Sequence, residues 1–452
     1  MLRRTKKGIR SVGGALCFLA LAATSATAQP PCDPLPAPSG VVVDVYPAQA
    51  AQLRGIVAGA ATGTTILLHD GYYDMSGGDW DYRLVFETPG VLLRSASGNR
   101  DAVILDGNYG TAELISIYAS DVTIAELTLM KAYDHPIHIS GHAGSPISGI
   151  LIHNVRIVDP GQQAIKVNPN ADGYIDFSTV ECSALELTDA GRAEIRDNCY
   201  TGGFDAHQAR GWVLRRNRIE GFWCDDGLSE HGIHLWKGCR DTVVEDNVIL
   251  DCARGIGFGL GSSGEARIYP DNPYPGVGYL GHIDGIIRNN FIAAADSRLF
   301  ASPDGFDTGI GLEQARGAQV VHNTVAATDR PLSSSIEWRF GNTVAEISIN
   351  LVTHTLLPRD GAQATLTGNI DSAPTGWFTD VAAGDLHLTE AAAAAVDAGT
   401  PLPAGQADSD IDGEARDAEP DVGADERTDA IFRDGFESGN LAAWSAVIGA
   451  AP

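Results

Sequence analysis

The chain has 452 residues and a formal net charge of −27; 44% of its residues are hydrophobic and 20% are charged. This length exceeds one ordinary core, so it predicts several domains or a repetitive architecture that grows along an axis. Apolar β-branched residues recur from Val41 to Val352, which excludes disorder for most of the chain. An acidic chain without a basic stripe also disfavours nucleic acid as a partner.

The N-terminus has the pattern of a secretory signal peptide. Five basic residues precede an apolar stretch at residues 15–23, and the small residues Ala26-Thr27-Ala28 follow as a cleavage site. No other apolar stretch reaches the length of a membrane span. The sequence therefore predicts an exported protein, either secreted, periplasmic or on the cell surface.

The cysteines support the same compartment. Six remain after removal of the leader, namely Cys32, Cys182, Cys199, Cys224, Cys239 and Cys252. An even count in an exported chain favours disulfides. Proximity suggests pairing of Cys182 with Cys199 and of Cys224 with Cys239, but the sequence does not choose among the possible connectivities.

A five-residue segment recurs along the chain. Its second and fourth positions are almost all large and apolar, its first is small or Pro, and its third and fifth are often polar. The copies begin at Pro136, Ala164, Gly203, Gly232, Gly255, Gly309 and Ser335. This period of two predicts a strand with one buried face.

A second recurring segment follows each copy of the first and ends in asparagine. These residues are Asn217, Asn247, Asn290, Asn323 and Asn350, and the spacings between them are 30, 43, 33 and 27 residues. Asn369 continues the series. Leu127 and Val155 hold the equivalent place in earlier copies. Repeats of this length built from short strands indicate a solenoid, in which stacked asparagines hydrogen-bond along the axis.

The repeats resemble the right-handed parallel β-helix of the pectate-lyase-like superfamily. Residues 58–73 resemble its usual first coil, and residues 91–99 and 103–107 resemble the next. The resemblance implies an all-β solenoid with stacked short strands and an asparagine ladder. It specifies chemistry weakly, because the superfamily includes lyases, hydrolases and carbohydrate-binding spike proteins. An ordinary β-sandwich would not repeat column by column.

These patterns divide the chain into five parts. We assign residues 1–28 to the signal peptide, 29–47 to an N-terminal linker, 48–390 to the β-helix, 391–427 to an acidic terminal segment that resembles those of other secreted β-helix proteins, and 428–452 to a C-terminal tail that is a candidate sorting motif.

Stacking places chemically active residues in rows on the outer face. The third-position row reads His138, Lys166, Asp205, His234, Gly257, Gly311 and Glu337. The fifth-position row reads Ser140, Asn168, His207, Trp236, Gly259, Glu313 and Arg339. Insertions between residues 169 and 200 and between 259 and 282 are expected to form walls beside them. Such a groove would suit a linear sugar chain.

The grouping of histidines, lysine and aspartate favours β-elimination on an acidic polysaccharide, which needs a base and a cation that stabilises the enolate-like charge. Lys166 is the candidate base if its neighbours lower its pKa, and His138 or His234 serves instead or as the acid. The expected catalytic set is Lys166, His138, His234, His207 and Asp205. The expected substrate-binding set is Trp236, Asn168, Glu313 and Arg339. The structural alternative is a surface lysine paired with Asp205.

Two other functions stay open. A glycoside hydrolase of the polygalacturonase-like type would use two carboxylates, and Asp205, Asp225, Asp226, Glu230 and Glu313 are available for this role. A non-catalytic adhesion or carbohydrate-binding protein would use the helix as a rigid rod. The strong negative charge of the chain argues mildly against a polyanionic substrate.

No cofactor is required by these patterns, but calcium is a candidate ligand. Residues 408–419 fit the D-x-D-x-D-G-x5-E pattern of a calcium loop, although prolines replace the flanking helices. A solvated acidic connector is the alternative. We expect a monomer whose partner is a polysaccharide.

Overall fold

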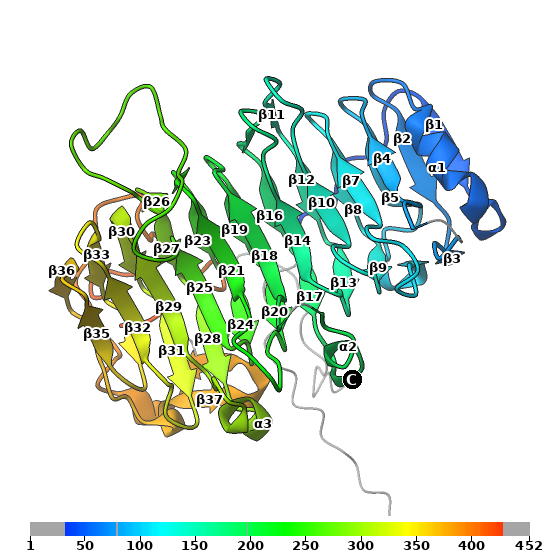
Figure 1. Ribbon diagram of the computed structural model, residues 1–452. Helices are drawn as coiled ribbons and strands as arrows, with labels where there is room; N and C mark the ends of the chain where they lie inside the picture. The colour runs from blue at the N-terminus through cyan, green and yellow to red at the C-terminus, as the bar shows by residue number, and fades with distance from the viewer. Residues whose placement is uncertain (1–31, 78–79, 197, 428–452) are drawn as a thin grey trace, which may run out of the picture.

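The computed structural model describes residues 32–77, 80–196 and 198–427. The signal peptide at 1–28 and the tail at 428–452 lie outside the described residues. The described chain winds into a solenoid whose coils each add one short strand to three long parallel sheets (Figure 1). The predicted right-handed parallel β-helix is confirmed.

Sheet C carries the first of the two recurring segments. Its ten strands are β4 (Leu84–Phe86), β7 (Ile115–Ile117), β10 (Ile137–Ile139), β14 (Gln163–Val167), β18 (Gly202–His207), β21 (His231–Trp236), β25 (Arg254–Phe258), β29 (Thr308–Glu313), β32 (Ser334–Arg339) and β35 (Leu356–Arg359).

Sheet A follows sheet C in each coil. It contains β1 (Val42–Val45), β2 (Thr65–Leu68), β5 (Leu92–Ser95), β8 (Thr123–Ala125), β12 (Leu151–His153), β16 (Thr179–Glu181), β19 (Val213–Arg215), β22 (Cys239–Arg240), β23 (Val243–Glu245), β26 (His282–Ile283), β27 (Ile286–Arg288), β30 (Ala315–Val321), β33 (Val344–Ser348) and β36 (Gln363–Thr367). Strand β1 falls within the residues that we assigned to the N-terminal linker, so the first coil begins before residue 48.

Sheet B completes each coil. Its strands are β3 (Gly71–Asp74), β6 (Val103–Asp106), β9 (Thr128–Met130), β13 (Arg156–Val158), β17 (Ala184–Glu186), β20 (Arg218–Glu220), β24 (Val248–Leu250), β28 (Phe291–Ala294), β31 (Thr324–Ala327) and β34 (Leu351–Val352). Two short pairs lie outside the three sheets, β11 (Ile147–Ser148) with β15 (Ile175–Asp176), and β37 (Phe378–Asp380) with β38 (Asp385–Leu388).

The helices cover ends and edges of the solenoid. Helix α1 (Ala50–Ala58) lies at the N-terminal end and buries Leu53 and Val57 against the core, so it covers an end that would otherwise expose apolar side chains. Helices α2 (Asp189–Arg192) and α3 (Ser297–Ala301) belong to the loops below sheet C in Figure 1. No helix among the described residues is long and apolar enough to cross a membrane.

The core is a column of aliphatic side chains enclosed by the three sheets. In sheet C the second and fourth positions of each repeat point inward, as Ile165 with Val167 and Phe204 with Ala206 show, and these four side chains are fully buried. The alternation follows from the two-residue period of a strand. It leaves the third position of each repeat on the outer face.

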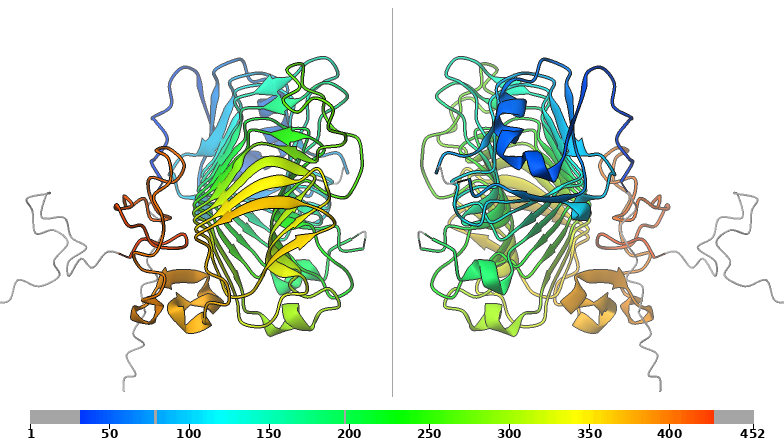
Figure 2. Two further views of the ribbon diagram at one scale, coloured as in Figure 1. Left: turned by 90° about the vertical axis from the view of Figure 1, so that its left-hand side faces the viewer. Right: turned by 90° about the vertical axis from the view of Figure 1, so that its right-hand side faces the viewer.

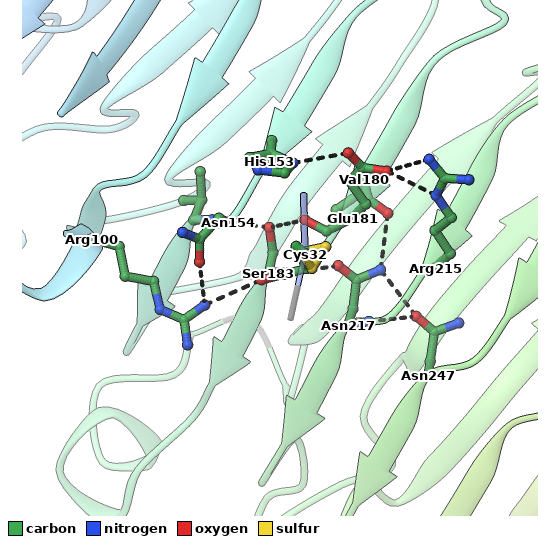
Figure 3. The surroundings of a disulfide bond; sticks show 12 residues. Cys32, Arg100, His153, Asn154, Val180, Glu181, Ser183, Arg215, Asn217 and Asn247 are labelled. Atoms are coloured by element: carbon green, nitrogen blue, oxygen red, sulfur yellow. Dashed lines mark hydrogen bonds and ion pairs between the residues drawn. A yellow bond between two sulfur atoms is a disulfide. The ribbon is translucent and has the colours of Figure 1, made fainter. Parts of the chain in front are cut away.

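The asparagine ladder is confirmed. Asn217 donates its side-chain amide to the Asn247 side-chain oxygen over 3.0 Å, and the same contact repeats through Asn290, Asn323 and Asn350 to Asn369 at 2.9–3.0 Å. Figure 3 shows its first members. Each asparagine side chain supplies hydrogen-bond partners to backbone groups of a buried turn, which would otherwise be unpaired.

The disulfides differ from those that proximity suggested. Cys32 pairs with Cys182, and Cys199 pairs with Cys224, while Cys239 and Cys252 are free and buried. The proposed Cys182–Cys199 and Cys224–Cys239 pairings are therefore wrong. The physical reason is that neighbours in a β-helix are set by stacking, which brings the N-terminal segment beside a coil that begins far along the chain (Figure 3).

Residues 378–426 pack against the outer face of sheet B. Leu386, Ile411 and Val422 join an apolar cluster with Leu250 and Phe291 of the sheet. Figure 2 shows this segment, in orange, running along the outside of the solenoid. The acidic terminal segment is therefore packed on the β-helix through a second apolar cluster.

Candidate functional site

The third-position row of sheet C forms in the register that the sequence predicts. Directly opposite one another on β10, β14, β18 and β21 lie His138, Lys166, Asp205 and His234. The row is more buried than the walled groove that we expected, since Lys166, Asp205 and His234 are only 2%, 1% and 0% exposed. Charged groups with so little exposure must be satisfied by one another.

Lys166 and Asp205 form the central pair of this buried group. The Lys166 ammonium donates a short hydrogen bond to Asp205 Oδ2 and lies 3.0 Å from the Tyr200 hydroxyl. Burial alone would lower the pKa of Lys166, but the charges of Asp205 and Tyr200 raise it above its ordinary value. Burial would raise the pKa of Asp205, but Lys166 and His207 hold it well below its usual range.

This result corrects one prediction. A lysine acts as a general base only when its pKa is lowered enough for the neutral amine to form at working pH. Lys166 has the opposite shift, so it is an ammonium ion and does not meet the condition for a base. The structural alternative is also wrong in part, because the Lys166–Asp205 pair exists but is buried rather than on the surface.

His207 and Trp236 form the more exposed edge of the group. His207 Nε2 lies 3.3 Å from Lys166 Nζ, and Trp236 Nε1 donates to Asp205 Oδ1 over 2.8 Å. His207 Nε2 also lies 3.5 Å from Asp205 Oδ2, so this nitrogen faces both members of the buried pair. Burial lowers the pKa of His207 despite the opposing effect of Asp205, so the ring is neutral at pH 7.

His234 lies on the other side of Asp205. Its Nδ1 is 3.7 Å from Asp205 Oδ1 and 3.1 Å from Glu230 Oε2, and its Nε2 is 3.2 Å from the carbonyl oxygen of Gly259. The ring stacks in parallel with Trp236. With no exposed surface, His234 reaches no sugar directly, so its predicted catalytic role has no direct route to substrate in this structure.

His138 belongs to a separate pair. Its Nδ1 lies 2.6 Å from Glu113, which also accepts from Ser116 and from Arg83. Burial alone would raise the pKa of Glu113, but these partners lower it to about 2. His138 is half-buried and neighbours Lys166 in register, so its proposed role as an alternative acid or base stays a prediction.

The predicted substrate-binding residues do not converge. Trp236 and Asn168 lie near the Lys166 group, on the strands or strand ends that carry Lys166 and His234. Glu313 and Arg339 lie farther along the solenoid, where Arg339 Nη1 is 3.3 Å from Glu313 and Arg339 Nε donates to Asp360 over 2.9 Å. The structure thus divides this set between two regions of sheet C.

A disulfide-linked pair of loops covers the Lys166 group. The Cys199–Cys224 bond joins the loop that carries Tyr200 to the loop that leads to Glu230. Glu230 N donates to the carbonyl oxygen of Thr201 over 2.8 Å, and Arg192 donates to two carbonyl oxygens in the second loop. The predicted first wall is therefore tied down next to the charged residues.

The second insertion lies at the opposite ends of the strands. Arg267 pairs with Asp176 at 2.7 and 2.8 Å, donates to the carbonyl oxygen of Gln208 and stacks over Tyr174. The two insertions therefore lie at the two ends of the strands of sheet C, as Figure 1 shows for the α2 loop and the long loop before β26.

Of the carboxylates proposed for hydrolysis, only Asp225 and Asp226 are exposed, and neither lies on sheet C. Asp225 and Asp226 are exposed in the loop that Cys224 anchors. Asp205 is enclosed by Lys166 and Trp236, while Glu230 contacts His234. A two-carboxylate mechanism needs both groups to face the sugar, and this geometry does not favour it.

The calcium-like loop directs its carboxylates to backbone amides. Asp410 accepts from the N–H groups of Asp412, Glu414 and Glu426, and Asp408 accepts from Gly405. These hydrogen bonds are those of a folded connector. The suggestion that calcium binds residues 408–419 stays a prediction.

Sequence reasoning missed two participants. Tyr200 lies at the end of an insertion outside every repeat, and its only sequence signal was the adjacent Cys199. Glu113 precedes strand β7, one coil before the strand that carries His138, and pairs with that histidine. Neither residue occupies a repeated position, so the column pattern could not find them.

Comparisons with known proteins concern the fold. No family model matches the chain, and no curated protein matches it in sequence. A solved alginate lyase from Paenibacillus sp. str. FPU-7 is similar with a TM-score of 0.49 and 15% identity, over 74% of this chain and 99% of that one. Pectate lyase Pel9A gives 0.48 and 13% over 83% and 90%. The tailspike protein of E. coli bacteriophage HK620 gives 0.45 and 11% over 70% and 57%.

Proposed function

We propose that the protein is an exported polysaccharide lyase that cleaves an acidic glycan by β-elimination beside the Lys166 group. The observation that carries the proposal is the convergence of Lys166, Tyr200 and His207 within 3.0–3.3 Å at the edge of a covered face. Two disulfides support an extracellular or periplasmic compartment. A monomer stays our expectation.

Tyr200 takes the proton-transfer role that we first gave to Lys166. The Lys166 ammonium donates to the Tyr200 oxygen, so the phenolic proton is directed elsewhere. When the phenol gives or takes a proton, the adjacent ammonium stabilises the charge on its oxygen. Lys166 thus acts on the substrate through Tyr200 and is a positioning residue.

The uronate carboxylate requires cations or hydrogen-bond donors. His207 contacts Lys166 and Asp205 through Nε2 rather than through Nδ1. Lys237, at the end of the same strand as Trp236, stacks 4.6 Å from the centre of the Trp236 ring and makes no ion pair with a carboxylate among the described residues. Trp236 is stacked with His234 and lies under Lys237, so it positions these two residues beside the Lys166 group.

The step balances within the glycan and these groups. The Tyr200 oxygen, deprotonated and stabilised by the Lys166 ammonium, removes the proton α to the uronate carboxyl, the electron pair forms the carbon–carbon double bond, and the β carbon–oxygen bond breaks. The leaving oxygen then takes that proton from the Tyr200 hydroxyl. Negative charge that develops on the carboxylate is stabilised by His207 and Lys237.

The test is the appearance of unsaturated uronate, followed by its ultraviolet absorbance, when the mature protein is mixed with a panel of uronate polysaccharides. We expect Tyr200→Phe to lose about 100-fold or more of the rate. Tyr118→Phe, at another half-buried tyrosine, is the matched control and keeps the rate. Product formation unchanged by Tyr200→Phe would remove Tyr200 from the mechanism.

A carbohydrate-binding rod without catalysis is the second candidate. It is favoured by the burial of Lys166, Asp205 and His234, which satisfy one another as a structural network would. In the same panel this alternative gives binding to a glycan with neither unsaturated products nor new reducing ends.

A further inference from the structure

A second group of side chains lies next to the Lys166 group and takes no part in the proposed elimination. Glu230, His231 and His234 come from the start of strand β21, and one ligand-capable atom from each lies within 4.8 Å of the other two. Glu230 Oε2, His231 Nδ1 and His234 Nδ1 are buried; Glu230 Oε2 and His234 Nδ1 lie 3.1 Å apart, but among the described residues none of the three atoms makes a hydrogen bond of good geometry. Three such atoms together are unusual, because buried polar atoms are nearly always paired.

The surroundings hold the His234 ring in place and leave room for the His231 ring. His234 Nε2 lies 3.2 Å from the carbonyl oxygen of Gly259. A histidine that donates one N–H to a carbonyl presents the lone pair of its other nitrogen, which is the usual arrangement of a metal-ligating histidine. His231 packs its Nε2 over Gly257, where an added Cβ would lie only 2.6 Å from that atom. The missing side chain at Gly257 therefore makes room for the His231 ring.

Arg254 is the cation next to this group. It lies 3.9 Å from Glu230 Oε2, and its guanidinium donates at 2.6 and 3.0 Å to the carbonyl oxygen of Ser229. Asp205 Oδ1, at 3.7 Å from His234 Nδ1, places a second carboxylate at the edge of the group. The group therefore combines two imidazoles and two carboxylates with one arginine at its edge.

We propose that Glu230, His231 and His234 form a binding site for Zn²⁺ or a closely related first-row divalent ion. Two imidazole nitrogens and one carboxylate are a zinc donor set, whereas calcium and magnesium prefer oxygen ligands alone. Ligand atoms around tetrahedral zinc lie about 3.4 Å apart, so binding draws the three side chains together by small rotations. A bound ion would tie the disulfide-linked loop at Glu230 to strand β21.

The test is calorimetric titration of Zn²⁺ into the mature, disulfide-bonded chain after removal of metal with a chelator. We expect one equivalent to bind and to raise the midpoint of thermal unfolding. His231→Gln should weaken this binding about 100-fold. The matched control is His142→Gln, at an exposed histidine paired with Glu87, and it should leave binding unchanged. Ca²⁺ should not compete.

Glu230→Gln gives a second route if the buried His231 variant fails to fold, because Glu230 is partly exposed. Circular dichroism establishes which variants are folded. Absence of Zn²⁺ binding by the unmodified chain would overturn the proposal, and so would equal affinity in the unmodified chain and a folded Glu230→Gln variant. Glycan cleavage is not a readout here, so the metal site and the proposed lyase activity succeed or fail separately.

Discussion

Sheet C carries two regions where charged residues pair across neighbouring coils, and the two differ in their environment. On β14 and β18, Lys166 and Asp205 pair with almost no exposed surface. On β29 and β32, Glu313 and Arg339 pair at 3.3 Å while their side chains stay 16% and 24% exposed. The pairs differ in their position in the repeat, since Lys166 and Asp205 hold the third position whereas Glu313 and Arg339 hold the fifth. Glu337, at the third position of β32, is also only 3% exposed. The loops joined by the Cys199–Cys224 disulfide lie beside the first pair only.

The comparison teaches that the position of a charged residue in the repeat affects its burial, and through burial its contribution to stability. A buried charge that loses its partner is costly, whereas an exposed pair contributes little. The same comparison separates the two regions functionally, because only the covered group brings a lysine, a tyrosine and a histidine together.

The largest effect should come from Lys166→Met. It leaves the Asp205 carboxylate buried without its main cation, which should lower the free energy of unfolding by about 3–5 kcal/mol. Urea unfolding followed by circular dichroism measures this loss. The double variant Lys166→Met/Asp205→Leu should recover much of it, since both charges are then gone. A loss below about 1 kcal/mol for Lys166→Met would mean that this buried pair contributes no more to stability than an exposed ion pair does.

The double variant Cys199→Ser/Cys224→Ser should release the two loops that lie beside the Lys166 group. Loss of this disulfide, whose cysteines are 25 residues apart, should lower the free energy of unfolding by about 3 kcal/mol. Tyr200 also loses its fixed position beside Lys166, so the rate of glycan cleavage should fall as well. The control is Cys32→Ser/Cys182→Ser, which loses stability but leaves the Lys166 group in place. If the two pairs of variants have the same cleavage rate, the disulfide does not position the site.

A third effect concerns the terminal segment and depends on pH. Burial alone would lower the pKa of His387, but contacts with Asp412, Asp425 and Asp385 raise it to about 9. Its contribution to stability is present in full below pH 6.5 and is lost as pH rises through about 9, on the order of 2–3 kcal/mol. Urea unfolding at pH 6.5 and above pH 9 measures the difference, and His387→Gln should reduce it. An unchanged pH dependence in that variant would contradict the assignment.

The smallest effect is expected for Arg339→Ala. It removes the contacts with Glu313 and Asp360, but at a solvated site the loss should be about 0–1 kcal/mol. The cleavage rate tests the original idea that Arg339 binds substrate. A large fall in rate with unchanged stability would bring this distant region back into the site.

Much of the fold was predictable from local patterns. The register of the row from His138 to His234 followed from aligning the repeats, because parallel strands of a solenoid stack equivalent positions. The asparagine ladder followed in the same way. Disulfide pairing did not, because Cys32 meets Cys182 only after the coils have stacked.

The site was predictable only where it lies on repeated positions. Lys166, Asp205 and His207 were found because they occupy those positions and lie together. Tyr200 was not found, since it contacts Lys166 from an insertion whose residues do not follow the repeat. The direction of the Lys166 pKa shift depended on that same contact and on burial.

The sequence by itself determined the solenoid, the stacking register and the identity of the residues on each row, because a two-residue strand period and a recurring asparagine specify these locally. Only the tertiary structure decided which of those residues are buried and which partners they meet. The reason is that solvation and charge pairing depend on what covers a surface, and here the cover comes from insertions that fold back from elsewhere in the chain.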